Sequence, residues 1–156
     1  MAVRRAALKK ERTAAIERLT AEWGYPVLVR DQAYAFDECE IFIAGELEGL
    51  AAVSLRDRPV AELVAINAFE KGRGIGTALI KAVVESLEGF DLLRITTTND
   101  NLDALRFYQR RGFRLAAIRP GAVDAARKLK PSIPPLGDYG IPIRDEIDLV
   151  LRVPRG

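Results

Sequence analysis

The chain has 156 residues, a net charge of +2, 49% hydrophobic residues, one cysteine and no histidine. This length and composition suit one domain with a substantial core. With Cys39 as its only cysteine and with no histidine, the chain cannot form an intrachain disulfide, a Cys/His zinc site or a Ser-His-Asp triad. No segment approaches the roughly 20 apolar residues of a membrane span, so we expect a soluble, cytoplasmic protein.

Hydrophobic periodicity and turn residues predict one helix and four strands in the first half of the chain. The helix covers residues 4–22 and stops before Gly24 and Pro26. The strands follow at 27–29, 40–44, 47–55 and 60–68. Tight turns at 44–46 and 56–59 connect the last three strands, which we therefore expect to be antiparallel neighbours.

The second half of the chain alternates helices with strands. The predicted elements are a helix from the glycine run to about residue 87, a strand at 92–98, a helix at 102–111 ended by Gly112, a strand at 113–119, a helical piece at 123–129 inside a proline-rich segment at 120–143, and a final strand at 146–153. An antiparallel meander followed by β-α-β-α-β predicts an α/β (α+β) fold. We expect one domain over residues 1–156, with a mixed central sheet and helices on both faces.

Three glycines, Gly72, Gly74 and Gly76, stand where the helix after strand 60–68 begins. The positions at which a dinucleotide fingerprint would need its last glycine hold Thr77 and Leu79, and no Gly-Lys-Ser/Thr completes a Walker loop. Glycines at a strand-to-helix junction still let the backbone approach a ligand closely, and the free N–H groups of a helix start suit a phosphate. A turn that only joins the two elements explains the loop equally well.

A second motif follows the next strand. Residues 96–113 read TTTNDNLDALRFYQRRGF and contain Asn-x-x-Ala-x-x-x-Tyr-x-x-x-Gly-Phe, with Lys71-x-x-Gly74-x-Gly76 upstream. In this order of motifs, over residues 40–119, the chain resembles the GNAT superfamily of acetyl-coenzyme A dependent N-acetyltransferases. The resemblance implies a GNAT-like fold whose core at 40–119 binds acetyl-CoA, the acetyl donor, and it implies no metal.

The resemblance also implies where the coenzyme lies. The backbone of strand 65–68 would meet the pantetheine arm and the thioester carbonyl, and the amides of 71–77 would hold the pyrophosphate. Lys71 stands where the family's loop usually opens with Gln or Arg. A lysine still offers positive charge to a phosphate, but it lacks the planar guanidinium of arginine. Asn101 is similar to the asparagine with which the family contacts the coenzyme. It is also a good N-cap for the helix after it, and one side chain can serve both purposes. The implied coenzyme-binding residues are Ile66, Asn67, Ala68, Lys71, Gly72, Arg73, Gly74, Ile75, Gly76, Thr77, Asn101, Ala104 and Tyr108.

Glu62 is the candidate general base. An alkyl amine with a pKa near ~10.4 is mostly protonated at neutral pH, so a group must take its proton before the nitrogen attacks. Glu62 is similar in place to the basic glutamate of histone-type family members, which often acts through water. The alternative is a charge on a solvated strand face. Alternation predicts one face with Glu62, Val64 and Ile66 and another with Leu63, Ala65 and Asn67.

Tyr108 is the candidate general acid, because it stands at the family's tyrosine position. A phenol with a pKa near ~10 is well matched to a departing thiolate that needs a proton. The alternative for Tyr108 is a half-buried aromatic that only packs beside Phe107.

The acceptor amine has no readable code. Small-molecule amines, polyamines, antibiotics, peptide amino termini and lysine side chains all suit the same coenzyme half. We expect specificity to lie in residues such as Tyr25, Tyr34 and Phe36 and in the tail. The segment 120–143 either lines the acceptor site or forms, with the last strand, a homodimer contact, and the charged RDEID that begins this strand is alternatively a solubilising edge.

Two other classes of function remain open. A non-catalytic, regulatory acyl-CoA-binding module would keep the glycine cradle while the acid and base are idle. A nucleic-acid binder would use the basic first helix and show salt-dependent affinity. A solvated amphipathic helix explains the same basic residues better, so binding to nucleic acid or to a membrane is not expected; these residues are Arg4, Arg5, Lys9, Lys10 and Arg12.

Overall fold

The computed structural model describes residues 2–24, 26–69 and 72–155. These residues form a seven-stranded sheet in the order β1-β4-β5-β6-β7-β9-β8 and a separate β2-β3 hairpin. The strands are β1 Val3–Arg5, β2 Val27–Val29, β3 Gln32–Tyr34, β4 Glu40–Ala44, β5 Gly49–Ser54, β6 Val60–Ala68, β7 Leu92–Thr98, β8 Arg114–Arg119 and β9 Glu146–Arg152. The helices are α1 Lys9–Trp23, α2 Ile75–Glu85, α3 Leu102–Arg110 and α4 Ala122–Leu129, with 3-10 turns η1 Phe36–Glu38 and η2 Asp138–Gly140.

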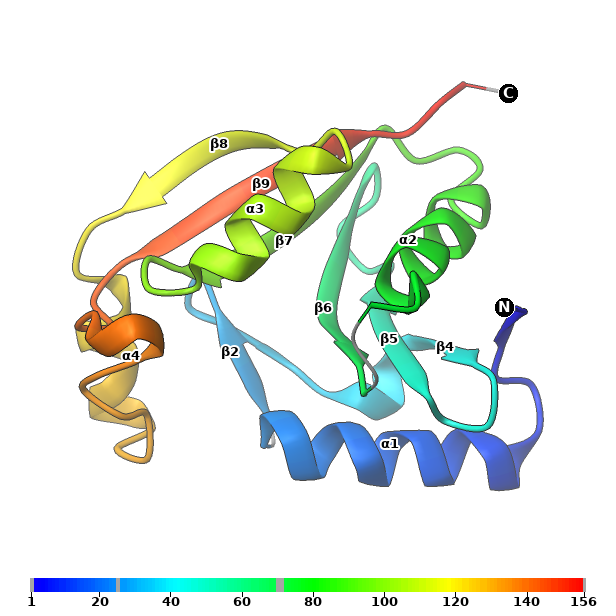
Figure 1. Cartoon of the computed structure of the whole chain (residues 1–156), viewed down its shortest axis with the longest axis horizontal. Coiled ribbons are helices and arrows are strands. Elements are labelled where there is room, and N and C mark those ends of the chain that lie inside the picture. The colour runs from blue at the N-terminus through cyan, green and yellow to red at the C-terminus, as the bar shows by residue number, and fades with distance from the viewer. Residues whose placement is uncertain (1, 25, 70–71, 156) are drawn as a thin grey trace.

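Helices cover both faces of the sheet, as predicted (Figure 1). One core cluster joins α2 and Tyr108 of α3 to side chains such as Phe42 and Leu63. A second cluster joins Ala15 and Leu19 of α1 to the opposite face of the same strands. The β2-β3 hairpin and η1 belong to this second side, which we call the α1 side. No helix among the described residues is long and apolar enough to span a membrane.

The amino terminus differs from the prediction. Residues 3–5 form an edge strand that pairs with β4, and the helix begins only at Lys9. The predicted helix at 4–22 includes the apolar residues Ala7 and Leu8, yet Leu8 is 71% exposed and the buried positions of α1 are Ala15 and Leu19. Hydrophobic spacing therefore extended the helix too far, because these two residues do not face the core.

The last strand is also placed differently from one alternative drawn from the sequence. β9 lies between β7 and β8 and pairs with both, so it is not a solubilising edge. Glu146 and Asp148 of the RDEID sequence are buried and paired with Arg119. The charges at the start of β9 are thus internal partners, and β8 is the free edge at this end of the sheet.

A bulge in β6 overturns the predicted alternation of its side chains. The β5-β6 register pairs Ala52 with Ala65 but Val53 with Leu63, which leaves Val64 as an extra residue. Val64 and Ala65 consequently both pack in the α1-side cluster, whereas Leu63 and Ile66 pack on the α2 side. The predicted sets are wrong, because strict alternation fails across a bulge.

Strands β6 and β7 separate after a short parallel ladder. They are the parallel pair of the sheet, and their register runs only from Val60 and Leu92 to Glu62 and Arg94. Beyond this point β6 continues along β5 to Ala68, while β7 continues along β9. The two strands therefore open a wedge that is visible in Figure 1.

Candidate active site

A cavity of about 580 Å³ lies at the open side of this wedge. We call it the α2-α3 cavity, because its walls are the exposed end of β6, the glycine loop with the start of α2, and one side of α3. The described lining residues are Ile66, Ala68, Gly72, Gly74, Ile75, Gly76, Thr77, Asp103, Ala104, Arg106, Phe107, Tyr108, Arg110 and Arg111. Both sequence motifs thus meet at one site.

Two of the glycines give the cavity an open floor. Gly72 and Gly74 have φ of +84° and +70°, and a Cβ built on either would meet no atom within 4 Å. Gly74 is the N-cap of α2 and carries no capping side chain, so the first N–H groups of the helix have no acceptor within it. This combination of space and free donors suits an anionic group. Lys71 lies outside the described residues.

Gly76 has a different purpose from the other two. A Cβ at Gly76 would lie 2.9 Å from Cζ of Phe107, so the missing side chain lets α2 pack against α3. Arg111 strengthens the same contact by donating to Oγ1 of Thr77 at 2.8 Å and by stacking 3.7 Å above the Phe107 ring. Gly76 therefore sets the distance between α2 and α3, the two helices that form walls of the cavity.

The edge of β6 supplies backbone groups to the wedge. The N–H of Phe69 donates to the carbonyl of Glu48, so Phe69 faces the neighbouring antiparallel strand. In an antiparallel pair, alternate residues turn their N–H and C=O groups toward opposite sides. The backbone groups of Ile66 and Ala68 consequently point into the wedge, and both residues line the cavity.

Tyr108 combines burial with access to the cavity. Its ring packs edge-on to Phe107 and Phe113, each with a centroid distance of 5.3 Å. Its hydroxyl makes no hydrogen bond within the described chain, and no described buried side-chain oxygen lacks a partner, so the hydroxyl is accessible from the cavity. Burial raises the pKa of Tyr108 above its ordinary value, which keeps the phenol protonated at neutral pH.

Of the remaining predicted binding residues, one lines the cavity and the others lie outside its lining. Ala104 lines the cavity. Asn101 is the N-cap of α3: its Oδ1 accepts from the Ala104 N–H at 3.3 Å, and its Nδ2 donates to Thr97 at 3.1 Å. Asn67 accepts a hydrogen bond from the Trp23 indole on the α1 side. Neither asparagine, nor Arg73, is among the described residues that line the cavity.

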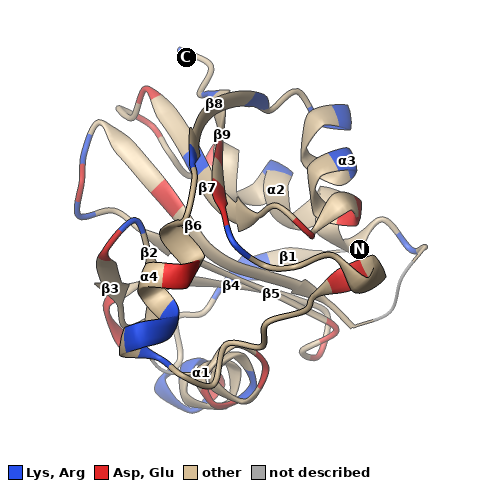
Figure 2. Ribbon diagram, turned by 90° about the vertical axis from the view of Figure 1, so that its left-hand side faces the viewer, with Lys and Arg blue, Asp and Glu red and all other residues tan. Residues whose placement is uncertain are grey.

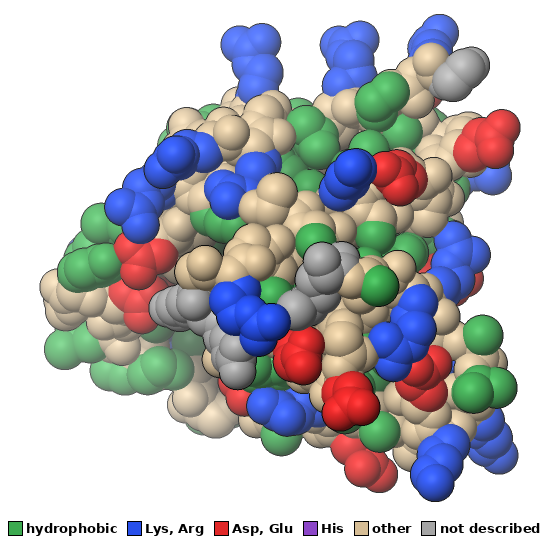
Figure 3. All heavy atoms as spheres, turned by 45° about the vertical axis from the view of Figure 1, so that its right-hand side comes forward, with side chains coloured by type: hydrophobic (Ala, Val, Ile, Leu, Met, Phe, Trp, Pro, Cys, Tyr) green, Lys and Arg blue, Asp and Glu red, His purple; other side chains and the backbone are tan. Residues whose placement is uncertain are grey.

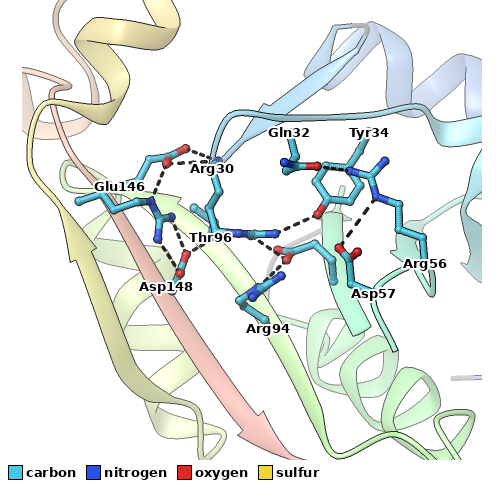
Figure 4. A network of polar contacts seen from close by, with 11 residues as sticks. Arg30, Gln32, Tyr34, Arg56, Asp57, Arg94, Thr96, Glu146 and Asp148 are labelled. Carbon is cyan, nitrogen blue, oxygen red and sulfur yellow. Dashed lines mark hydrogen bonds and ion pairs between the residues drawn. The ribbon is translucent and has the colours of Figure 1, made fainter. Parts of the chain in front are cut away.

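Glu62 lies in a network of charges on the α1 side, and its partners Arg30 and Arg94 are labelled in Figure 4. Its side chain is 2% exposed, and its Oε1 is 2.7 Å from Nη1 of Arg30 and 2.8 Å from Nε of Arg94. Oε2 has no such partner among the described residues. Burial raises the pKa of Glu62, and the hydrogen bonds and charges of Arg94 and Arg30 oppose that rise only in part. The exposed strand-face alternative is therefore wrong.

The network continues from β6 across β7 to β9. Arg30 donates to the hydroxyls of Thr96 and Tyr34, and Thr96 donates to Asp148 at 2.6 Å. Arg119 of β8 makes two bonds of 2.7 Å to Asp148 and one of 3.1 Å to Glu146. The arginine-carboxylate network, as we call it, consists of Arg30, Glu62, Arg94, Arg119, Glu146 and Asp148.

From the sequence, Glu62 was singled out as a catalytic candidate, and Glu146 and Asp148 only as charges of the RDEID segment; the three arginines were missed. The residues of the network come from four strands and the β2-β3 turn, which are neighbours in the fold but far apart in the sequence. No short sequence motif therefore connects them. Arg94, a charge within the apolar strand LLRITTT, was the clearest available signal. Tyr34 and Phe36 were expected to face the acceptor, but both are buried in the α1-side core, and Tyr25 lies outside the described residues.

The proline-rich segment is fastened to the beginning of α3. Asp100 accepts from the N–H of Asp138 at 3.0 Å, and the Tyr139 hydroxyl donates to Asp103 at 2.7 Å. Asn99 donates to the carbonyl of Pro142. The segment therefore borders the end of α3 that faces away from the α2 contact.

Comparison with known proteins assigns the chain. The profile of the Acetyltransferase (GNAT) family matches residues 7–113. The chain belongs to the GNAT family of acetyltransferases. It is 39% identical over 132 residues to the uncharacterized protein YdhI of Bacillus subtilis, covering 80% of this chain and 82% of that one. YxbD of the same organism, also uncharacterized, is 37% identical over 135 residues, with 82% and 84% covered. The chain is accordingly an acyltransferase.

Solved structures show the same fold. A GNAT family acetyltransferase from Elizabethkingia anophelis with acetyl-CoA bound has a TM-score of 0.69 at 21% identity, and 97% of each chain is covered. A Bacillus subtilis acetyltransferase in complex with CoA has a TM-score of 0.69 at 22% identity, with 97% of this chain and 98% of that chain covered. The predicted mixed α/β architecture is thus confirmed.

Proposed function

We propose that residues 1–156 form one N-acetyltransferase domain that transfers the acetyl group of acetyl-coenzyme A to a primary amine. The observation that carries this proposal is the α2-α3 cavity, which joins an open glycine floor, the free backbone edge of β6 and the Tyr108 hydroxyl. The acceptor class includes small molecules, peptide amino termini and lysine side chains. The neighbours that bind acetyl-CoA or CoA have this fold.

The residues of the cavity suit the coenzyme. The amides at Gly72, Gly74 and the start of α2 would hold the pyrophosphate, because they offer donors where a Cβ would meet nothing. The backbone of Ile66 and Ala68 would orient the pantetheine arm and the acyl carbonyl. Asn67, Arg73 and Asn101 would support this arrangement from outside the cavity wall. The coenzyme, when bound, supplies an activated thioester.

Two side chains of the protein would move protons. Burial raises the pKa of Tyr108, so the phenolic oxygen keeps its proton at neutral pH, and the hydroxyl is directed as a hydrogen-bond and proton donor toward the departing sulfur. Glu62 lies on the other side of the sheet, at the point where β6 and β7 part. Its Oε2 takes the proton of the amine, directly or through water, while the two arginines hold Oε1 in place.

A second candidate function is a regulatory acyl-CoA-binding module without turnover. The observation that favours it is the pairing of Glu62 with Arg30 and Arg94, since a carboxylate in two ion pairs is commonly structural.

The basic first helix gives nucleic-acid binding less support: α1 carries acidic as well as basic residues, and the face in Figure 3 shows both signs interspersed. We propose a cytoplasmic location and no metal requirement.

The decisive experiment measures coenzyme binding and coenzyme A release side by side over a broad amine panel. Binding with transfer to at least one amine supports the enzyme. Binding without transfer to any amine favours the regulatory module. Absence of binding contradicts both, because each requires the α2-α3 cavity to accept the coenzyme.

A homodimer through β8 is a further part of this proposal. β8 is the free edge of the sheet, and its Leu115 and Ile118 are 55% and 62% exposed. Antiparallel pairing of this edge in two copies would bring the exposed Leu115 and Ile118 of one copy against those of the other. Sedimentation should show a dimer that Ile118→Lys converts to a monomer. A monomeric wild type would contradict this contact.

A further inference from the structure

The walls of the α2-α3 cavity are strongly basic along α3. Arg106, Arg110 and Arg111 line it, against a single described carboxylate, Asp103. Figure 2 shows the same distribution, with basic residues toward the end of α3 and an acidic one near its beginning. Three cations around one cavity repel one another, so this wall is complementary to an anion.

The three arginines are not equivalent. Arg111 is used inside the protein, where it bonds to Thr77 and stacks on Phe107. Arg106 and Arg110 make no hydrogen bond or ion pair within the described part of the chain. Asp103 accepts a bond from Tyr139, and it does not come within ion-pair distance of Arg106. Two neighbouring guanidinium groups therefore remain available to a ligand.

The spacing of these two residues brings them together. Residues four apart lie on the same side of a helix, and like charges at that spacing destabilise it by a few tenths of a kcal/mol. Arg110 in the last turn is alternatively explained by the helix dipole, but that explanation does not extend to Arg106, one turn earlier. A shared anion accounts for both positions.

The pair also lies close to the glycine floor. The bond from Arg111 to Thr77 fixes the end of α3 beside the start of α2. A ligand whose diphosphate rests on Gly72 and Gly74 would thus bring a second anionic group toward α3. In coenzyme A the 3′-phosphate of the ribose is such a group, and dephospho-coenzyme A lacks it.

We propose that Arg106 and Arg110 bind the 3′-phosphate of coenzyme A and make the protein discriminate against dephospho-coenzyme A. The inference rests on the proposed function, because it assumes that the coenzyme occupies the α2-α3 cavity. Charge-assisted bonds from arginine to phosphate should favour coenzyme A by on the order of tenfold or more. The preference should fall as salt rises, since both guanidinium groups border solvent.

The test is calorimetric titration of the full chain with coenzyme A and with dephospho-coenzyme A. The variants are Arg106→Gln with Arg110→Gln, and Arg114→Gln as a control of equal chemistry outside the cavity; Arg111 is retained because it joins the two helices. We expect the wild type and Arg114→Gln to prefer coenzyme A, and the double variant to bind both compounds with nearly equal affinity.

The outcomes separate this inference from the proposed function. Equal affinities in the wild type would overturn the 3′-phosphate site while leaving coenzyme binding intact. An undiminished preference in the double variant would overturn the assignment to these two arginines. If neither compound binds a folded wild type, the proposed function fails, and the inference fails with it.

Discussion

The two sides of strand β6 differ in how their space is filled: one side is an open cavity and the other is packed with paired charges. On the α2 side, glycines and a free strand edge keep a cavity of about 580 Å³ open. On the α1 side, Glu62 is enclosed with two arginines, and the charges continue through Thr96 to Asp148. The open side is built from residues close in sequence, whereas the filled side is assembled from distant strands. The open side therefore depends on a few local residues, whereas the filled side depends on contacts between strands that are distant in sequence.

The largest expected effect comes from the open side. Tyr108→Phe keeps the ring and its packing against Phe107 and Phe113 but deletes the donor. Proton donation typically contributes ~10²- to 10⁴-fold, so we expect a turnover loss of at least about tenfold with normal folding and coenzyme affinity. Steady-state kinetics with any accepted amine measure this loss. Full activity would remove Tyr108 from the mechanism.

On the filled side, Glu62→Gln should lower turnover by about tenfold or more at high pH and remove the acid limb of the rate profile. The sign follows from burial: the raised pKa of Glu62 means that the base becomes ionised, and active, only above the ordinary carboxylate range. The wild-type rate should therefore rise with pH as Glu62 becomes ionised, at a pH above the ordinary pKa of a glutamate. Glu85→Gln on α2 is the control, and an unchanged profile in Glu62→Gln would assign the base elsewhere.

A comparison of neighbouring glycines sharpens the difference within the open side. Gly76→Val should destabilise the fold by about 1–3 kcal/mol, because its side chain would overlap Phe107. Gly72→Ala should cost only about 1 kcal/mol of backbone strain at φ +84°, since nothing lies near its Cβ. Denaturant unfolding measures both. Equal costs would show that the α2-α3 contact is not as close as described.

The smallest effect concerns the acid stability of the network. Burial alone would raise the pKa of Asp148, but hydrogen bonds from Arg119 and Thr96 outweigh it, so the pKa is lowered. A lowered pKa stabilises the fold above the unfolded value, near ~3.9, and this stability is lost as pH falls toward the folded pKa. Asp148→Asn should cost about 1 kcal/mol at pH 7 and flatten the dependence below about pH 5, with Asp37→Asn as the matched control. Chemical unfolding at several pH values decides this.

The same division explains what the sequence could predict. The order of strands and helices from β4 onward followed from periodicity and turns, and the cavity from two motifs with fixed spacing. The edge strand at Val3, the bulge at Val64 and the insertion of β9 between β7 and β8 depend on which strands meet in space. The partners of Glu62 were hidden for the same reason, because Arg30 and Arg94 are 32 residues away from it on either side.

The extra residue at Val64 makes the length of β6 as important as its composition. Deleting Val64 would remove the bulge and restore regular alternation, because Ala65 and Ile66 would keep their partners Ala52 and Ala51. The backbone groups of Ile66 and Ala68 would then still point into the wedge. Deleting Asn67 instead would move Ala68 by one position and turn its backbone groups toward β5. A single-codon deletion therefore preserves the surface that β6 presents to a ligand when it falls at the bulge, and reverses part of that surface when it falls beyond it.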